Sequence, residues 1–239
     1  MESLKEKQAH RIIVAGIGPG SPDYLVPAAR RAIESAKYLV GGRRALAQFA
    51  KTSGVQDAAA ERQTSCSAQA CEEATQKTCA VTRDIDGVLS FVRDGLAEAD
   101  VVVMVSGDPG YFSLLDALRR TFDERLIDVI PGISSFQLAF ARLALPWHDA
   151  DLLSFHGRVP DDAALRYAPG RKLGLLTDQQ HNSQTIAETL LAHGWPADAR
   201  YAICARLSYE DETVERMTLG EAAKHEPVGS CIVVVEACK

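Results

Sequence analysis

The sequence of 239 residues has no long hydrophobic run. No apolar stretch approaches the roughly 20 residues that a helix needs to cross a bilayer. Residues 1–11, MESLKEKQAHR, are polar and have no apolar signal region. We therefore expect a cytoplasmic protein without a membrane span. The sequence also lacks an excess of positive charge, because 32 acidic residues outnumber 26 lysines and arginines and the net charge is −6. Such a chain has no general attraction to nucleic acid, and we expect no nucleic-acid partner.

The sequence also lacks a paired cysteine motif, although it contains six cysteines. None is spaced as CxxC, and Cys204 and Cys231 lie in apolar runs that are typical of strands. We therefore interpret the cysteines as reduced thiols and predict no metal site. The polar surroundings of Cys66, Cys71 and Cys79 favour exposure and leave the role of these three open.

The apolar residues indicate an α/β fold. Continuous apolar runs such as RIIVAGI and VVVMV (101–105) predict buried parallel strands, and they alternate with segments of helical spacing. The pattern predicts helices over 27–37, 86–99 and 183–194, with Asp86 and Ser183 as N-caps and Gly194 as the C-terminal stop. Residues 51–83 predict a loop and a helix.

Two cycles of strands and helices predict two α/β domains. We expect an N-terminal domain over 11–122 and a C-terminal domain over 125–239, whose strand LIDVI would begin the second cycle. The segment ARLSYEDETVERMTL predicts two strands around a turn at Glu210–Asp211. The second domain is therefore expected to have a mixed sheet with antiparallel pairing.

The first strand leads into the glycine-rich loop IVAGIGPGSPDYL (13–25). A dinucleotide fingerprint needs a third glycine, but Ser21 stands at that position. Pro19 has no N–H to offer to a phosphate. The loop disfavours a pyrophosphate cradle and favours a rigid turn against which a bulky ligand can lie; a simple strand-to-helix turn is the alternative.

Two further loops follow apolar strands. Ser106-Gly107-Asp108-Pro109-Gly110-Tyr111 offers a carboxylate on a fixed bend, and Pro131-Gly132-Ile133-Ser134-Ser135 opens a helix. Ligands of open α/β sheets bind outside the carboxyl ends of the strands, and a helix N-terminus suits a ligand carboxylate. Local capping by Asp108 and by Ser134 or Ser135 is the alternative interpretation.

Taken together, GIGPGSPDYL, SGDPGYFS and PGISSFQ resemble the tetrapyrrole methylase family. The resemblance continues through LALPWHDADLLSFHGR, LGLLTD and ARLSYEDETVERMTL, and covers about residues 12–236. It implies two α/β domains around a cleft, a homodimer, and S-adenosyl-L-methionine as the cofactor. The motifs match the subfamily that methylates carbon 5 of a cobalt-precorrin in cobalamin biosynthesis.

The resemblance also implies site residues. The positions that match the family's cofactor contacts are Pro19, Ser106, Gly107, Asp108, Tyr111, Ser134, Ser135, Leu176, Met217 and Thr218.

Catalytic and substrate-binding residues are less well marked. His156 and Tyr111 are candidate proton acceptors, with Asp108 a further one. Arginine suits the many carboxylates of a corrin precursor, so Arg43, Arg44, His156 and Arg158 are candidate substrate contacts. Relatives that act on uroporphyrinogen have an aspartate where this sequence has Gly42-Arg43-Arg44, so their acid–base residue has no counterpart.

Some relatives continue into a second, decarboxylating methylase domain that acts on carbon 15. The sequence stops before such a domain, so we expect a separate C15-methyltransferase as functional partner. The alternatives are a methylase of the same fold with another tetrapyrrole, a protein or an RNA as substrate, and a non-catalytic or NAD-type nucleotide-binding protein.

Overall fold

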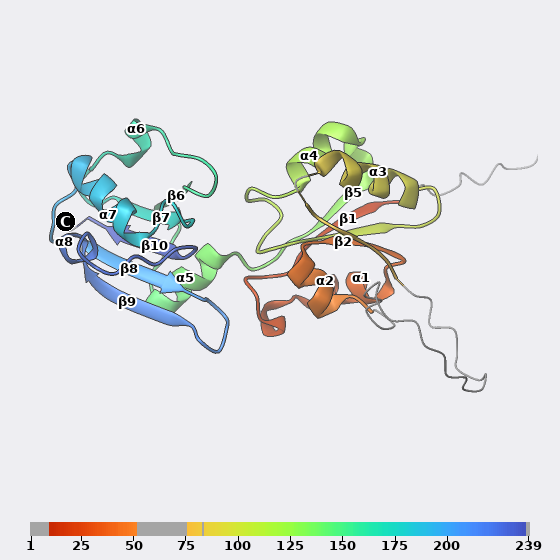
Figure 1. Cartoon of the computed structure of the whole chain (residues 1–239), viewed down its shortest axis with the longest axis horizontal. Coiled ribbons are helices and arrows are strands. Elements are labelled where there is room, and N and C mark those ends of the chain that lie inside the picture. The colour runs from red at the N-terminus through yellow and green to blue at the C-terminus, as the bar shows by residue number, and fades with distance from the viewer. Residues whose placement is uncertain (1–9, 52–75, 83, 238–239) are drawn as a thin grey trace, which may run out of the picture. The chain divides into compact units, whose positions relative to one another are not determined.

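The computed structural model describes residues 10–51, 76–82 and 84–237 (Figure 1). Within them the chain forms two compact units. The N-terminal unit extends to Gly132 and leaves out the short segment Pro19–Ser21. The C-terminal unit comprises Pro19–Ser21 and the chain from Ile133 onward.

The N-terminal unit is a five-stranded parallel sheet in the order β3-β2-β4-β1-β5. Its elements are β1 (Ile12–Gly16), a 3₁₀ turn (Pro22–Tyr24), α1 (Pro27–Ser35), β2 (Tyr38–Gly41), α2 (Arg43–Phe49), β3 (Lys77–Ala80), α3 (Ile85–Gly95), β4 (Val101–Val105), α4 (Leu115–Thr121), a second 3₁₀ turn (Glu124–Leu126) and β5 (Ile127–Ile130).

Helices cover both faces of this sheet. On one face, Ala29 and Ile33 of α1 and Ala45 of α2 pack against the strands. On the other face, helices α3 and α4 pack against them. Val101–Val105 of β4 is buried along its whole length. The continuous apolar run that predicted a central strand is explained by this two-sided burial.

The C-terminal unit has a mixed sheet in the order β6-β7-β10-β8-β9, in which only β6 and β7 pair in parallel. Helix α5 packs Phe136 and Phe140 near Gly174 on one face, while α7 and α8 contribute to the core on the other. The elements are α5 (Ser135–Leu143), β6 (Ala150–Ser154), α6 (Asp162–Leu165), β7 (Lys172–Leu176), α7 (Ser183–Ala192), β8 (Arg200–Ala205), β9 (Thr213–Thr218), α8 (Leu219–Ala222) and β10 (Ile232–Glu236).

The expected fold class is confirmed, and so is the mixed second sheet. Strands β8 and β9 form the expected antiparallel pair around Glu210–Asp211. The division between the units differs from the expected 122–125, because LIDVI does not begin the second cycle. As β5, this strand pairs in parallel with β1 and completes the first sheet.

Several local predictions need correction. The N-cap of α3 is Asp84, whose carboxylate accepts from the Gly87 N–H at 2.9 Å, and Asp86 lies inside the first turn. Asn182 caps α7, and the predicted cap Ser183 is instead buried in its first turn. Lys77–Ala80 forms a strand within the range expected to be loop and helix.

The structure also bears on the cysteines and on the expected lack of a membrane span. Cys204 is buried in β8, Cys231 is buried just before β10, and Cys79 is half-buried. Cys66 and Cys71, like most of the loop and helix predicted over 51–83, lie outside the described residues. Along the described part of the chain, no helix has both the length and the apolar character to span a membrane.

The corrected cap of α7 gives a stability prediction. The Asn182 side chain accepts from the N–H groups of Gln184 at 3.0 Å and Thr185 at 3.1 Å. Asn182→Ala removes this acceptor, so we expect the free energy of unfolding to fall by about 1 kcal/mol. Urea denaturation of this variant beside Glu188→Ala, at an exposed position of the same helix, measures the difference. Equal stability of the two variants would contradict the capping role.

Candidate functional site

The strand order of the N-terminal unit creates a switch point between β1 and β4. From β1 the chain crosses β4 to reach β2, and from β4 it crosses β1 to reach β5. The helices that follow these two strands lie on opposite faces of the sheet, as Figure 1 shows for α1 and α4. In open α/β sheets the ligand binds outside the carboxyl ends of such a pair of strands. The loops that follow β1 and β4 therefore form the candidate site.

Three backbone turns meet at this switch point. A Cβ on Gly16 would lie 2.6 Å from the Gly132 nitrogen and 2.7 Å from the Gly107 carbonyl oxygen. A Cβ on Gly132 would collide with the same oxygen. Glycine is therefore required where the ends of β1, β4 and β5 converge. Gly107 also has a φ of 68°, which residues with a side chain seldom adopt.

Asp108 fixes the two outer turns to one another. One of its carboxylate oxygens accepts from the Gly110 N–H at 2.8 Å, and the other accepts from the Gly132 N–H at 3.0 Å. The alternative interpretation of Asp108 as a local cap is thus present, and its contacts reach beyond its own turn. The result is a rigid, acidic surface with little side-chain bulk.

The same loops are not arranged as a pyrophosphate cradle. The Gly18 N–H donates to the Gly107 carbonyl at 3.3 Å, and the Gly107 N–H donates to the Gly18 carbonyl at 2.8 Å. These amides are therefore engaged with each other. Helix α1 begins only at Pro27, so its N-terminus does not follow directly on β1 as a dinucleotide site requires. Both observations agree with the prediction made from Pro19 and Ser21.

The segment Pro19–Ser21 packs within the C-terminal unit. The Ser21 N–H donates to Ser208 Oγ at 3.0 Å, and the Tyr209 ring lies where a Cβ on Gly20 would be. Arg206 in turn lies over the Tyr209 ring, at 4.5 Å from its centroid. The turn after β8 therefore contacts Gly20 and Ser21, which the sequence did not indicate.

The two serines expected to contact the cofactor lie at the start of α5. Ser134 is the N-cap: its hydroxyl accepts from the Phe136 N–H at 3.2 Å, and Gln137 accepts from the Ser134 N–H at 2.8 Å. Ser135 is the first residue of the helix. The capping alternative is thus present for Ser134, and it occupies the Ser134 N–H.

Three expected cofactor residues lie at the ends of strands in the C-terminal unit. Leu176 is the half-buried last residue of β7, and Met217 lies in β9. Thr218 ends β9 and caps α8, with its N–H donating to the Glu221 carboxylate at 2.8 Å. The backbone N–H of Thr218 is therefore already engaged in the cap.

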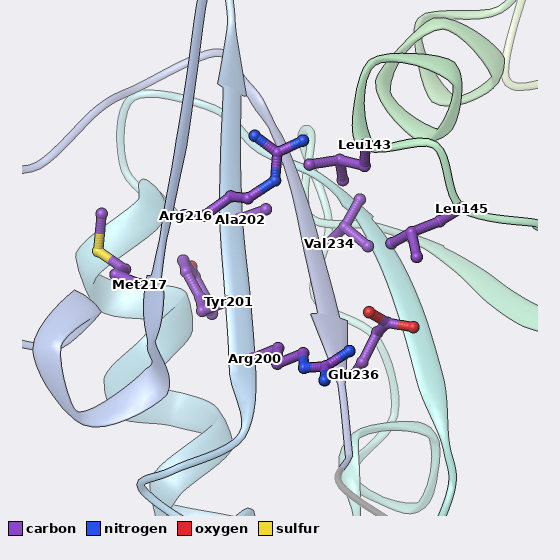
Figure 2. Close-up of a pocket in the computed structure, with 9 residues that line it drawn as sticks. All are labelled: Leu143, Leu145, Arg200, Tyr201, Ala202, Arg216, Met217, Val234 and Glu236. Carbon is purple, nitrogen blue, oxygen red and sulfur yellow. The ribbon is translucent and has the colours of Figure 1, made fainter.

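A pocket of about 300 Å³ in the C-terminal unit does not coincide with the expected site (Figure 2). Its lining contains only one expected residue, Met217, whose side chain points away from Val234 and packs on the core. Aliphatic side chains and Ala202 form its floor, with Arg200, Arg216 and Glu236 around them. The switch point, in the other unit, remains the better-founded site.

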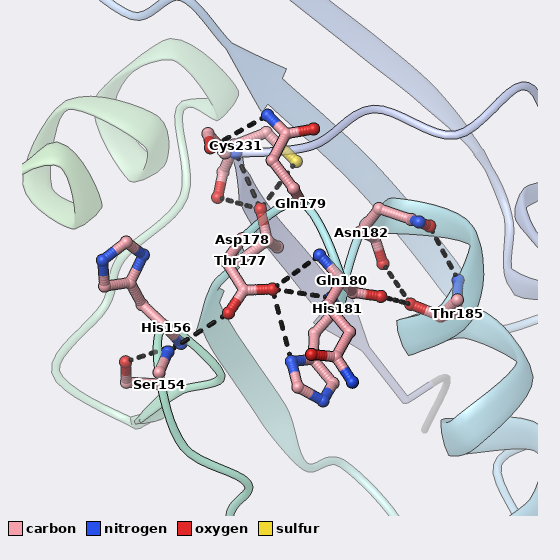
Figure 3. A network of polar contacts seen from close by, with 12 residues as sticks. Ser154, His156, Thr177, Asp178, Gln179, Gln180, His181, Asn182, Thr185 and Cys231 are labelled. Atoms are coloured by element: carbon pink, nitrogen blue, oxygen red, sulfur yellow. Dashed lines mark hydrogen bonds and ion pairs between the residues drawn. The ribbon is translucent and has the colours of Figure 1, made fainter.

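The loop His156-Gly157-Arg158 follows β6 and is held by Asp178, which follows the adjacent strand β7 (Figure 3). The Asp178 carboxylate accepts from the N–H groups of His181 at 2.7 Å, Gln180 at 2.9 Å and Gly157 at 3.1 Å. Together with the nearby His181 ring, these bonds lower the pKa of Asp178 to about 2, with the His181 N–H contributing most. Asp178 lies in the LGLLTD motif, but this anchoring role was not predicted from the motif.

The remaining candidate residues are exposed or partly buried. Figure 3 shows the exposed His156 ring directed away from the Asp178 carboxylate. Arg43 and Arg44 are exposed on the first turn of α2, and Arg158 is exposed beside His156. Tyr111, partly buried, lies with its ring 4.6 Å from that of Phe112. His156 and Arg158 thus share one loop of the C-terminal unit, while Arg43, Arg44 and Tyr111 belong to the N-terminal unit.

Comparison with known proteins agrees with this geometry. The family model for tetrapyrrole (corrin/porphyrin) methylases matches residues 11–223, and the chain belongs to that family. Within it, the chain is 32% identical over 183 residues to the cobalt-precorrin-7 C(5)-methyltransferase of Salmonella typhimurium, covering 77% of this chain and 79% of the relative. A precorrin-6Y C(5,15)-methyltransferase (decarboxylating) of Sinorhizobium is 32% identical over 57% of this chain and 33% of its own.

A solved structure shows the same fold. Uroporphyrin-III C-methyltransferase from Thermus thermophilus, solved in complex with S-adenosyl homocysteine, superposes with a TM-score of 0.66 at 22% identity. The superposition covers 94% of this chain and 91% of that one. The fold expected from the sequence motifs is thereby confirmed.

The Asp178 anchor gives a pH-dependent prediction. Asparagine keeps one acceptor oxygen but replaces the other with an NH₂ group, which cannot accept from a backbone N–H. Because folding lowers the pKa of Asp178, its stabilising contribution is complete above the ordinary aspartate pKa and is lost as the pH falls through about 2. We expect Asp178→Asn to unfold at lower urea concentration than the wild type at pH 6, and the difference to shrink between about pH 4 and pH 2.

Glu210→Gln serves as the control, since Glu210 is exposed on the turn between β8 and β9. It should unfold like the wild type at pH 6. A difference for Asp178→Asn that stays constant down to pH 2 would mean that the ionised carboxylate does not anchor the loop.

Proposed function

We propose that this protein transfers a methyl group from S-adenosyl-L-methionine to carbon 5 of cobalt-precorrin-7, in cobalamin biosynthesis. The observation that carries the proposal is the switch point with its glycine turns and the Asp108 carboxylate, found in a chain that shares 32% identity with a cobalt-precorrin-7 C(5)-methyltransferase. The S-adenosyl homocysteine in the Thermus relative supports the choice of cofactor.

The residues at the switch point fit this cofactor. When bound, S-adenosyl-L-methionine supplies a methyl group on a positively charged sulfur, which is already an activated donor. The acidic Asp108 and the exposed Ser106 suit a ligand that carries a sulfonium cation beside an amino-acid zwitterion. The paired amides of Gly18 and Gly107 do not suit a pyrophosphate. The better fit of these loops to S-adenosyl-L-methionine than to a pyrophosphate favours a methylase over an NAD-type protein.

Rigid placement is the main task of these loops. Holding two reactants in line at near-contact distance is worth about 7–11 kcal/mol in intramolecular models. The bonds from Asp108 to Gly110 and Gly132 keep the turns from moving when a ligand arrives. We propose that Ser106, Gly107, Asp108 and Tyr111 bind the cofactor.

The expected contacts from the C-terminal unit also remain proposals. These residues are Pro19, Ser134, Ser135, Leu176, Met217 and Thr218. For substrate carboxylates we propose Arg43, Arg44 and Arg158, which are all exposed. His156 and Tyr111 are proposed proton acceptors, because methylation of a ring carbon must be balanced by loss of a proton or by redistribution of charge in the macrocycle.

We further propose a cytoplasmic homodimer. A C15-methyltransferase that removes a carboxylate is the proposed functional partner, because the Sinorhizobium relative has both activities in its name. The mass in solution, measured by light scattering, tests the dimer: a monomeric mass would reject it.

Calorimetric titration with S-adenosyl homocysteine tests the proposed cofactor. We expect micromolar binding of this ligand and no binding of NADPH, because the Gly18 and Gly107 amides are paired. Asp108→Ala should weaken the binding by about tenfold, since it releases the Gly110 and Gly132 turns.

Asp116→Ala is the matched control, at an exposed position of α4 in the same unit. It should bind S-adenosyl homocysteine like the wild type. Binding of NADPH alone would reject the methylase, and unchanged affinity of a folded Asp108→Ala variant would reject the assignment of Asp108.

Arg158 gives a prediction for the substrate. Arg158→Ala removes a cationic fork that suits carboxylates. We expect the KM for cobalt-precorrin-7 to rise by about tenfold, while the affinity for S-adenosyl homocysteine stays within twofold. Steady-state kinetics and calorimetry on one preparation measure both values. Loss of cofactor affinity with an unchanged KM would place Arg158 at the cofactor instead.

A further inference from the structure

The loop after β4 contains a strained aromatic residue. Phe112 has a φ of 47°, in the left-handed region that disfavours any residue with a side chain. For a bulky residue this conformation costs free energy, and it persists only where surrounding contacts impose it. Strain of this kind concentrates at functional sites.

The neighbouring residues impose the strain. The Tyr111 N–H donates to the Asp108 carbonyl at 3.3 Å, and the Ser113 hydroxyl donates to the Pro109 carbonyl at 2.6 Å. The Leu115 N–H then donates to Ser113 Oγ at 3.1 Å, at the start of α4. Phe112 is thus fixed between two bonded turns of the candidate site.

About half of the ring remains accessible. The Phe112 side chain is 51% exposed. Its edge-to-face contact with Tyr111 keeps the ring in a defined orientation, at an interplanar angle of 72°. The fold therefore leaves part of an oriented aromatic ring exposed on a backbone with a positive φ.

We infer that the Phe112 ring is a binding surface for the conjugated part of the substrate macrocycle. The inference rests on the proposed function, which requires a tetrapyrrole beside the cofactor. The ring lies four residues after Asp108, on the loop that follows β4 at the switch point. An aromatic ring gains from contact with the conjugated part of such a macrocycle, and the proposed partners of its carboxylates are the arginines.

Phe112→Gly separates this role from a structural one. Glycine removes the ring and also tolerates the positive φ, so we expect the melting temperature to stay the same or rise. The Kd of cobyrinic acid, a stable corrin used as the probe, should rise by about tenfold, and so should the KM for cobalt-precorrin-7. The affinity for S-adenosyl homocysteine should stay within twofold. Phe112→Tyr, which keeps the ring, should restore probe binding.

Ala144→Gly is the matched control, because Ala144 also has a positive φ, of 54°, at the C-cap of α5. It should keep or raise the melting temperature and leave probe binding unchanged. Unchanged probe affinity in Phe112→Gly would overturn the inference. So would a fall in S-adenosyl homocysteine affinity, which would place the ring at the cofactor, or a lower melting temperature, which would make it structural.

The result that would reject the proposed function differs from the results that would reject the role of the Phe112 ring. A wild-type protein that binds cobyrinic acid but does not methylate cobalt-precorrin-7 rejects the reaction, and the variants still decide the role of the ring. A wild-type protein that binds no corrin at all overturns both.

Discussion

The close approach of three backbone turns at Gly16, Gly107 and Gly132 is the constraint on which the N-terminal unit depends. No side chain fits where the ends of β1, β4 and β5 converge, so the chain can only pass there as glycine. The Asp108 carboxylate then fixes the turns by accepting from two of their amides. The loop that contains Phe112 continues directly from this contact.

The C-terminal unit uses the same device with a different residue. Asp178 follows β7 and binds the Gly157 amide in the loop after the adjacent strand β6. In both units a carboxylate therefore fixes two loops that follow different strands, through backbone amides that are strong donors to an ion. Loops preorganised in this way suit a methyl transfer, in which the protein mainly has to hold two reactants in line.

Strain is also concentrated in the loops. Residues other than glycine adopt a positive φ at Phe112 and, on the turn after β8, at Arg206 and Ser208. That turn holds Pro19–Ser21 through Ser208 and the Tyr209 ring. The cores beneath the loops are conventionally packed, with β4 and most of β10 buried. Stability in the cores thus allows costly conformations where ligands are expected.

Sequence alone determined the buried central strands, because a strand buried on both faces must be continuously apolar, as VVVMV is. It did not predict the half-exposed strand β3. It also predicted that the loop after β1 is not a pyrophosphate cradle, since the missing N–H of Pro19 and the missing third glycine are local features of the sequence. Tertiary structure alone decided that LIDVI joins the first sheet, that β10 lies between β7 and β8, and that Asn182 rather than Ser183 caps α7. It also decided the partners of Asp108, Asp178 and Tyr209. These outcomes depend on which distant backbone groups come within hydrogen-bond distance, and a local pattern carries no information about that distance.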